Sequence, residues 1–175
     1  DAKKFSTKQL KELHRYVQIV FQDPFSSLNP RMTVFDIIGE GLKTQNLVKN
    51  KLQQEKKVLE LLEQVGLPAD AIYRYPHEFS GGQRQRIVIA RALAVKPRII
   101  ICDEPTSALD HRSQEQIINL LIDLQNRFGL SYLFITHNMQ LAAAIADNIA
   151  IMKDGKIIPN ATNSTLTLNS VKYET

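Results

Sequence analysis

Polar side chains stand directly after three apolar segments of the chain that we expect to be strands. Gln22 follows the first segment, the Asp103–Glu104 pair follows the second, and His137 follows the third. If the strands are parallel, their carboxyl ends lie along one edge of the sheet, where α/β proteins bind ligands. One carboxylate could then hold Mg²⁺, and the other could orient or deprotonate an attacking water. The pattern therefore predicts phosphoryl-transfer chemistry at this edge.

Each of these residues also has a plain structural explanation. An isolated Asp-Glu pair often caps a loop and pairs with a nearby arginine, and a lone histidine at a strand end is commonly a satisfied polar residue. For Asp103 and Glu104, the other polar strand ends favour the catalytic interpretation. Cys102 lies inside an apolar run and is expected to be an inert core residue. No His/Cys cluster has the spacing of a zinc or iron–sulfur site.

A second candidate site is the segment Ser80-Gly81-Gly82-Gln83, which opens a predicted helix. Two glycines let a phosphate approach the backbone closely. The helix that follows offers free N–H groups and the positive end of its dipole, and the serine hydroxyl adds a donor. Ser80 and Gln83 also have the spacing of a capping box. Taken alone, the segment is a weak signal for a phosphate site, because a helix cap after a turn is common.

Five segments, in the same order as in the family, resemble motifs of ATP-binding cassette (ABC) proteins: the Q-loop (Gln22), the signature (Phe79–Gln83), Walker B (99–104), the D-loop (Ser107–Asp110) and the switch histidine (His137). Phe79 stands where the family usually has leucine and keeps the apolar character. Residues 21–31 and 75–80 resemble the oligopeptide/dipeptide importer branch, although nickel importers share similar motifs. The resemblance covers residues 16–155.

The resemblance implies a role for each matching position. Asp103 would hold Mg²⁺, and Gln22 would sense Mg²⁺ or water and relay movement to a helical subdomain. Glu104 would be the catalytic base, and His137 would contact the γ-phosphate of ATP. The remaining matches would act at ATP bound to the opposite subunit or across the dimer interface: Ser80, Gly81, Gly82, Gln83 and Asp110.

The resemblance also implies partners and a location. It implies a second ABC ATPase domain in a homo- or heterodimer, and transmembrane permease subunits touched by residues near 24–42. A periplasmic or extracellular substrate-binding protein would take part indirectly. The implied function is an ATP-hydrolysing motor of an importer, for peptides, bound peripherally to the cytoplasmic face of a bacterial inner or plasma membrane.

The elements that must position these residues alternate between strand and helix, which predicts an α/β, P-loop NTPase-like domain with a mostly parallel sheet. Residues 99–102 form a continuous apolar run, which is typical of a strand buried on both faces. Residues 25–32 are expected to form a loop. Residues 24–90 break the alternation and are expected to be an inserted helical subdomain. The catalytic core would then be 16–23 with 91–158, followed by a tail at 159–175.

The predicted elements follow from periodicity, caps and breakers. We expect helices over 6–15, 33–42, 53–65, 80–94, 112–128 and 139–146. We expect strands over 16–21, 98–102 and 131–136, and a hairpin over 148–158 with its turn at Asp154-Gly155.

Composition narrows the class of protein. Apolar residues make up 43% and charged residues 23%, as in ordinary globular domains, and no apolar run approaches the ~20 residues of a membrane span. The net charge of +4 comes from scattered lysines and arginines, which favours a solvated surface over a nucleic-acid partner. A single cysteine fits a reducing compartment. We therefore expect a soluble, cytoplasmic protein.

No P-loop motif G-x-x-x-x-G-K-S/T occurs among the seven glycines of the chain. The resemblance places that loop, and an aromatic residue that stacks on adenine, upstream of Gln22. We therefore expect that the chain begins after both, leaves apolar surface uncovered, binds MgATP weakly and is inactive alone.

Two alternatives stay open. One is a degenerate regulatory ABC domain without its own hydrolysis, which the intact Glu104 and His137 disfavour. The other is a soluble ABC protein acting on ribosomes or DNA, which the Q-loop sequence disfavours.

Overall fold

The computed structural model describes residues 5–158, which divide into two compact units. The first unit ends at Ile135 and holds a three-stranded sheet with most of the helices. The second unit begins at Thr136 and holds one helix and a β-hairpin. The candidate residues therefore fall into two groups, with all but His137 in the first unit.

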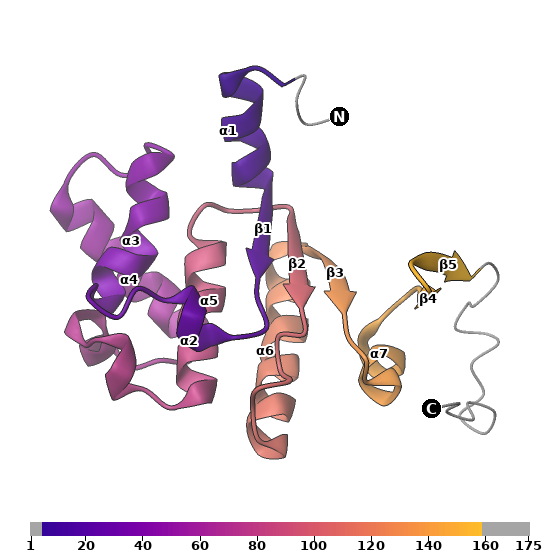
Figure 1. The fold of residues 1–175 in the computed structure, drawn as a ribbon. Helices are drawn as coiled ribbons and strands as arrows, with labels where there is room; N and C mark the ends of the chain where they lie inside the picture. Colours follow the sequence, from indigo (N-terminus) through magenta and orange to yellow (C-terminus); the bar gives the residue numbers. More distant parts are fainter. Residues whose placement is uncertain (1–4, 159–175) are drawn as a thin grey trace. The chain divides into compact units, whose positions relative to one another are not determined.

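The sheet of the first unit is parallel throughout, with the strand order β1-β2-β3. Its strands are β1 (Val17–Val20), β2 (Ile99–Asp103) and β3 (Ser131–Ile135), drawn as arrows in Figure 1. Val20 pairs with Cys102, which pairs with Phe134, so the carboxyl ends of the strands lie side by side. The α/β class and the parallel arrangement predicted from the sequence are confirmed.

Only one face of this sheet is covered in the described structure. Ile100 and Cys102 are fully buried, whereas Ile99 is 40% exposed and Leu133 is 55% exposed. The prediction that 99–102 would be buried on both faces is therefore wrong for this structure. Helices α5 (Gly81–Leu93) and α6 (His111–Phe128) pack together, and α5 packs against β1. The expected uncovered apolar surface is present on the sheet.

A group of helices separates β1 from β2 along the chain. Its members are α2 (Pro24–Ser27), α3 (Val34–Thr44), α4 (Lys51–Gln64), η2 (Ala69–Tyr73), η3 (Pro76–Glu78) and α5. The predicted apolar face of α4 is confirmed, because Val58, Leu62 and Val65 are fully buried. Gly66 follows at φ +69°, a left-handed conformation that suits glycine at a helix end.

The expected loop at 25–32 begins with the one-turn helix α2. Pro24 occupies the first turn of α2, where its missing N–H costs nothing. Asp23 caps the helix, since its carboxylate accepts from the backbone N–H groups of Phe25 at 2.8 Å and Ser26 at 3.3 Å. Capping chemistry thus overrides the loop-like composition of this segment.

The remaining predicted helices and the hairpin are confirmed. Helix α1 (Thr7–Tyr16) begins at the predicted capping box of Ser6 and Gln9. In the second unit, α7 (Met139–Ile145) precedes β4 (Ile151–Lys153) and β5 (Lys156–Ile158), which pair antiparallel. Positive φ angles at Asp154 and Gly155 fit the primed turn of a two-residue hairpin. The predicted tail at 159–175 lies outside the described residues.

None of the helices in the described part of the chain is long and apolar enough to cross a membrane.

Candidate functional site

The carboxyl ends of β1 and β2 bring two of the predicted residues together. Gln22, two residues after β1, and Asp103, the last residue of β2, line one open hollow of about 640 Å³. The register explains this, because Val20 pairs with Cys102 and each strand continues into the same edge. Arg91, from helix α5, lines the same hollow. The convergence inferred for Gln22 and Asp103 is thus present in the geometry.

Glu104 follows Asp103 in an unusual backbone conformation. Its φ is +44°, in the left-handed region that residues with a side chain seldom occupy. Its N–H donates to the carbonyl of Ile135 at 3.0 Å, and its carbonyl accepts from the hydroxyl of Ser107 at 3.1 Å. Such strained residues cluster at functional sites when their surroundings hold them in place. The sharp turn begins directly after the last strand residue.

His137 belongs to the second unit, two residues beyond the end of β3. It precedes Asn138, which caps helix α7 by accepting from the N–H of Leu141 at 3.1 Å. The convergence of His137 with Gln22 and Asp103 stays a prediction.

The donor atoms around the hollow fit a hard cation. Asp103 offers carboxylate oxygens and Gln22 an amide oxygen, which are ligand types that Mg²⁺ accepts. Within residues 5–158, Asp103 forms no ion pair, and no group of three His, Cys, Asp or Glu side chains could hold a metal alone. Mg²⁺ usually combines one or two protein oxygens with water and phosphate oxygens. The site matches that pattern better than it matches an all-protein cage.

Two arginines of α5 hold the segment after Gln22 in place. Nη1 of Arg91 donates to the carbonyl of Ser27 at 2.5 Å, and the guanidinium carbon of Arg84 lies 3.9 Å from the ring centroid of Phe25. Burial lowers the pKa of the Arg91 guanidinium, and the charge of Glu40 raises it in part. Helix α5, which begins at the signature segment, is therefore held against the residues that follow Gln22.

Neither arginine was among the residues predicted from the sequence. A signal was available for Arg91, because it interrupts the apolar run Ile87-Val88-Ile89-Ala90 and Ala92-Leu93 of the helix. A charged residue in such a run needs a polar partner when it is buried.

The start of α5 is built as a capping box. The hydroxyl of Ser80 accepts from the N–H of Gln83 at 3.4 Å, and Oε1 of Gln83 accepts from the N–H of Ser80 at 3.0 Å. A Cβ added at Gly81 would lie 3.2 Å from Leu109, and one at Gly82 would lie 3.3 Å from the hydroxyl of Ser113. The glycines therefore let α5 approach the segment that precedes and opens α6.

Asp110 is the N-cap of α6. Its carboxylate accepts from the hydroxyl of Ser113 at 2.7 Å and from the N–H of Ser113 at 3.0 Å. These bonds, with the hydroxyl contributing most, hold the pKa of Asp110 below its ordinary value of 3.8. Asp110 thus has a local structural role that the sequence analysis did not assign, although its position before an amphipathic helix was a capping signal.

Cys102 is fully buried in β2, which confirms its prediction as a core residue. Burial raises the pKa of its thiol to about 12. The thiol is therefore protonated at neutral pH and has no part in the site.

The parallel sheet, with an acidic residue at the end of its central strand and helices packed on one face, is that of an α/β, P-loop NTPase-like domain. A family model described as "ABC transporter" matches residues 1–107. The chain belongs to this family.

Three comparisons extend this result. The chain is 56% identical over 153 residues to the "Oligopeptide transport ATP-binding protein OppF" of Bacillus subtilis (strain 168). This match covers 87% of the chain and 50% of that protein. It is 50% identical over 163 residues to the "Dipeptide transport ATP-binding protein DppF" of Lactococcus lactis subsp. cremoris (strain MG1363), covering 93% and 52%. The solved dimeric cassette MJ0796 bound to ADP and Pi has a TM-score of 0.73 at 31% identity, covering 88% of this chain and 66% of that one.

The chain spans about half the length of the curated relatives it matches. Both relatives are named as ATP-binding proteins of peptide transport, and the solved structure is a nucleotide-bound dimer. The fold class and the importer-branch resemblance found in the sequence are confirmed.

Proposed function

We propose that the protein is the ATP-binding and ATP-hydrolysing motor subunit of an ABC importer that carries peptides. The observation that supports this most directly is the high identity to two peptide-transport ATP-binding proteins over nearly the whole chain. The hollow that holds Gln22 and Asp103 at the sheet edge is compatible with it.

In this proposal, the chain's own residues act on MgATP from one edge of the sheet. Asp103 and Gln22 supply oxygen ligands for Mg²⁺. Glu104 accepts a proton from the attacking water, and its backbone is held in place by hydrogen bonds to the Ile135 carbonyl and from the Ser107 hydroxyl. His137 donates a hydrogen bond to the γ-phosphate.

A second copy or a related ATPase domain would complete the site. The exposed Ser80 hydroxyl with Gly81, Gly82 and Gln83 would face the nucleotide of the opposite subunit, and Asp110 would lie at the dimer interface. The nucleotide-bound dimer among the structural relatives supports this arrangement.

The further partners are permease subunits, which would touch residues near 24–42, and a substrate-binding protein acting indirectly. The subunit would lie peripherally at the cytoplasmic face of a bacterial membrane. In domain terms, residues 24–90 would be the helical subdomain, with 16–23 and 91–158 forming the catalytic core and 159–175 the tail.

The 175-residue chain should bind MgATP weakly on its own and should not hydrolyse it. It has no P-loop motif, so neither the backbone cradle for the phosphates nor the P-loop lysine is available. A calorimetric titration of the chain with MgATP checks this, and micromolar affinity would contradict it.

The test of catalysis is Glu104→Gln in the whole protein assembled with its permease. We expect ATP turnover to fall by about 10²–10⁴-fold, the usual contribution of a general base, while ATP binding persists. Glu60→Gln, on the exposed side of α4, is the matched control and should leave turnover unchanged. If Glu104→Gln leaves turnover unchanged as well, the regulatory-domain alternative replaces the motor.

A further inference from the structure

The side chain of Gln114, near the start of α6, holds the loop that joins β2 to this helix. The loop runs from Glu104, the proposed general base, to Asp110, the residue proposed for the dimer interface. Nε2 of Gln114 donates to the carbonyl of Thr106 at 3.0 Å and to the carbonyl of Leu109 at 3.1 Å. Because an amide nitrogen carries two hydrogens, both bonds can form at once. One side chain thus ties two points of the loop to the 18-residue helix α6.

The two partners decide which end of the Gln114 amide faces the loop. Both are carbonyl oxygens, which accept hydrogen bonds and cannot donate them. The nitrogen end of the amide must therefore face the loop, since the oxygen end would meet two acceptors. A side chain of the same length without this donor can make neither bond.

The start of α6 does not depend on the Gln114 side chain. Asp110 caps the helix by accepting from the N–H and the hydroxyl of Ser113 at 3.0 and 2.7 Å. The backbone N–H of Gln114 donates to the Asp110 carbonyl at 2.9 Å, and this bond is independent of the side chain. The two bonds from the Gln114 amide therefore serve the loop and are not required for helix formation.

The loop also has short-range bonds of its own. The N–H and the hydroxyl of Ser107 donate to the Glu104 carbonyl at 3.2 and 3.1 Å. The N–H of Leu109 donates to the Thr106 carbonyl at 3.1 Å, so this carbonyl accepts from both Leu109 and Gln114. Local bonds fold the loop into turns, and Gln114 fixes these turns to the helix.

The far half of the loop meets the signature segment. A Cβ added at Gly81 would lie 3.2 Å from the side chain of Leu109, whose carbonyl Gln114 holds. Gly81 follows Ser80, which is proposed to face the nucleotide of the opposite subunit. The loop that Gln114 holds therefore lies between the proposed base and the proposed contact with the second subunit.

We propose that Gln114 is a positioning residue for ATP hydrolysis. Its amide keeps the loop in one arrangement, so that Glu104 and Asp110 stand in fixed places when the second ATPase domain closes on the site. This inference rests on the proposed function, because it takes Glu104 as the general base. We expect the amide to affect turnover and not ATP affinity, since displacing a base slows the chemical step without removing nucleotide contacts.

The main test is Gln114→Met in the whole protein assembled with its permease. Methionine has nearly the length of glutamine but no donor for the two carbonyls. We expect kcat to fall about 10–100-fold, because misplacing a reacting group by about 1 Å costs on the order of 10²-fold. The KM for ATP should change by less than about twofold, as expected when ground-state binding is kept.

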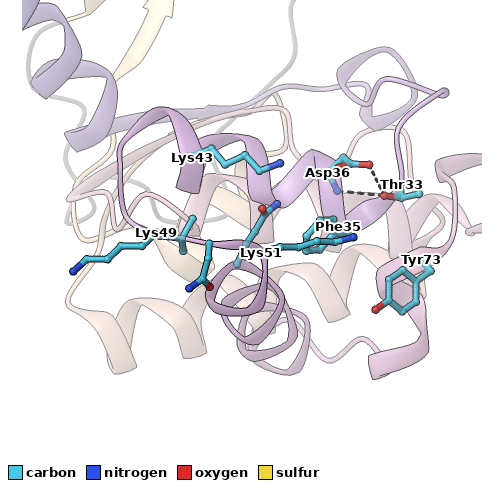
Figure 2. Close-up of a pocket in the computed structure, with 10 residues that line it drawn as sticks. Thr33, Phe35, Asp36, Lys43, Lys49, Lys51 and Tyr73 are labelled. Atoms are coloured by element: carbon cyan, nitrogen blue, oxygen red, sulfur yellow. Dashed lines mark hydrogen bonds between the residues drawn. The ribbon is translucent and has the colours of Figure 1, made fainter.

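Two control variants remove comparable groups elsewhere. Gln116→Met makes the same exchange at an exposed position of α6. Tyr73→Phe removes the hydroxyl that donates to Glu55 at 2.6 Å; Tyr73 lines a cavity of about 620 Å³ that none of residues 104–114 lines (Figure 2). Both controls should leave kcat unchanged. If kcat falls no further in Gln114→Met than in the controls, the positioning role is wrong.

A double-mutant cycle shows whether Gln114 acts through Glu104. In the Glu104→Gln protein, adding Gln114→Met should lower turnover by less than about twofold, because the group to be positioned is already lost. Effects that multiply independently would overturn the inference and leave Gln114 a purely structural role. If Glu104→Gln alone leaves turnover unchanged, the proposed function fails, and this inference fails with it.

Amide hydrogen exchange of the 175-residue chain gives a local readout in the absence of ATP. In Gln114→Met, the N–H of Leu109 should lose protection, because the turn that it closes is no longer fixed to α6. The N–H of Ser113, which the Asp110 carboxylate holds, should keep its protection. Equal loss at both amides would mean that the helix start has opened, which would contradict a role specific to the loop.

Discussion

Replacing Arg91 by methionine should loosen the segment that follows Gln22. Nη1 of Arg91 donates to the carbonyl of Ser27 at 2.5 Å, and this bond joins α5 to the end of α2. Methionine keeps much of the aliphatic stem but removes the charged donor. A hydrogen bond with a charged partner contributes about 1.5–3 kcal/mol, so the free energy of unfolding should fall by that amount. For a chain of this size, the loss lowers Tm by about 3–12 °C.

The assay has a global and a local readout. Urea denaturation gives the change in the free energy of unfolding, and amide hydrogen exchange reports on α2. The N–H of Ser27, which donates to the carbonyl of Asp23 at 3.3 Å, should lose protection in the Arg91→Met variant. Arg91→Lys should recover part of the stability, since lysine keeps the charge but has a different reach and geometry.

The matched control is Arg31→Met, an exposed arginine a few residues after α2. It removes the same charge and should change stability by no more than about 0.5 kcal/mol. If both variants lose stability equally, the effect comes from net charge, and the clamp between α5 and α2 does not contribute.

Three further predictions concern the core, a thiol and a helix cap. Leu62→Ala should lower the free energy of unfolding by about 2–5 kcal/mol in urea denaturation, because Leu62 is fully buried, whereas Leu52→Ala, at a site 77% exposed, should cost far less. Cys102, with a thiol pKa of about 12, should not react with Ellman's reagent at neutral pH until denaturant is added; fast reaction of the native chain would contradict its burial. Ser113→Ala should raise the pKa of Asp110 toward 3.8 in a carboxyl NMR titration. Because the folded-state pKa of Asp110 is lowered, the cap stabilises the protein above pH 3.8, and this contribution is lost as pH falls through the folded-state pKa. If the pKa of Asp110 is unchanged in Ser113→Ala, its shift comes from other groups.

Local signals in the sequence predicted most of the fold. Capping boxes located the starts of α1 and α5, and Asp154-Gly155 located the hairpin turn. These features depend on residues a few positions apart, so no tertiary information is needed to find them. The one-turn helix α2 was missed because loop-like residues are helical there only through the Asp23 cap.

Contacts between distant segments were harder to predict. The apolar run of β2 looks the same whether one or both faces are covered, since what packs on each face depends on the rest of the chain. Polar strand ends did predict that Gln22 would meet Asp103, because parallel pairing brings the strand ends to one edge. The charge of Arg91 inside an apolar helical run was a signal, but its partner could not be predicted, because the Ser27 carbonyl is a backbone atom 64 residues away that no sequence pattern marks.

The order of the strands also constrains how the chain folds. Val17 of β1 pairs with Ile99 of β2, and the helices α2 to α5 lie between them, whereas Ile99 pairs with Ser131 of β3 across a much shorter stretch. Closing a longer loop costs more chain entropy, so β2 and β3 with α6 between them can assemble before β1 joins. Docking of β1 requires both ends of the helical insert to come together, and this long-range step should slow folding. The edge where Gln22 meets Asp103 would then be among the last parts of the first unit to form.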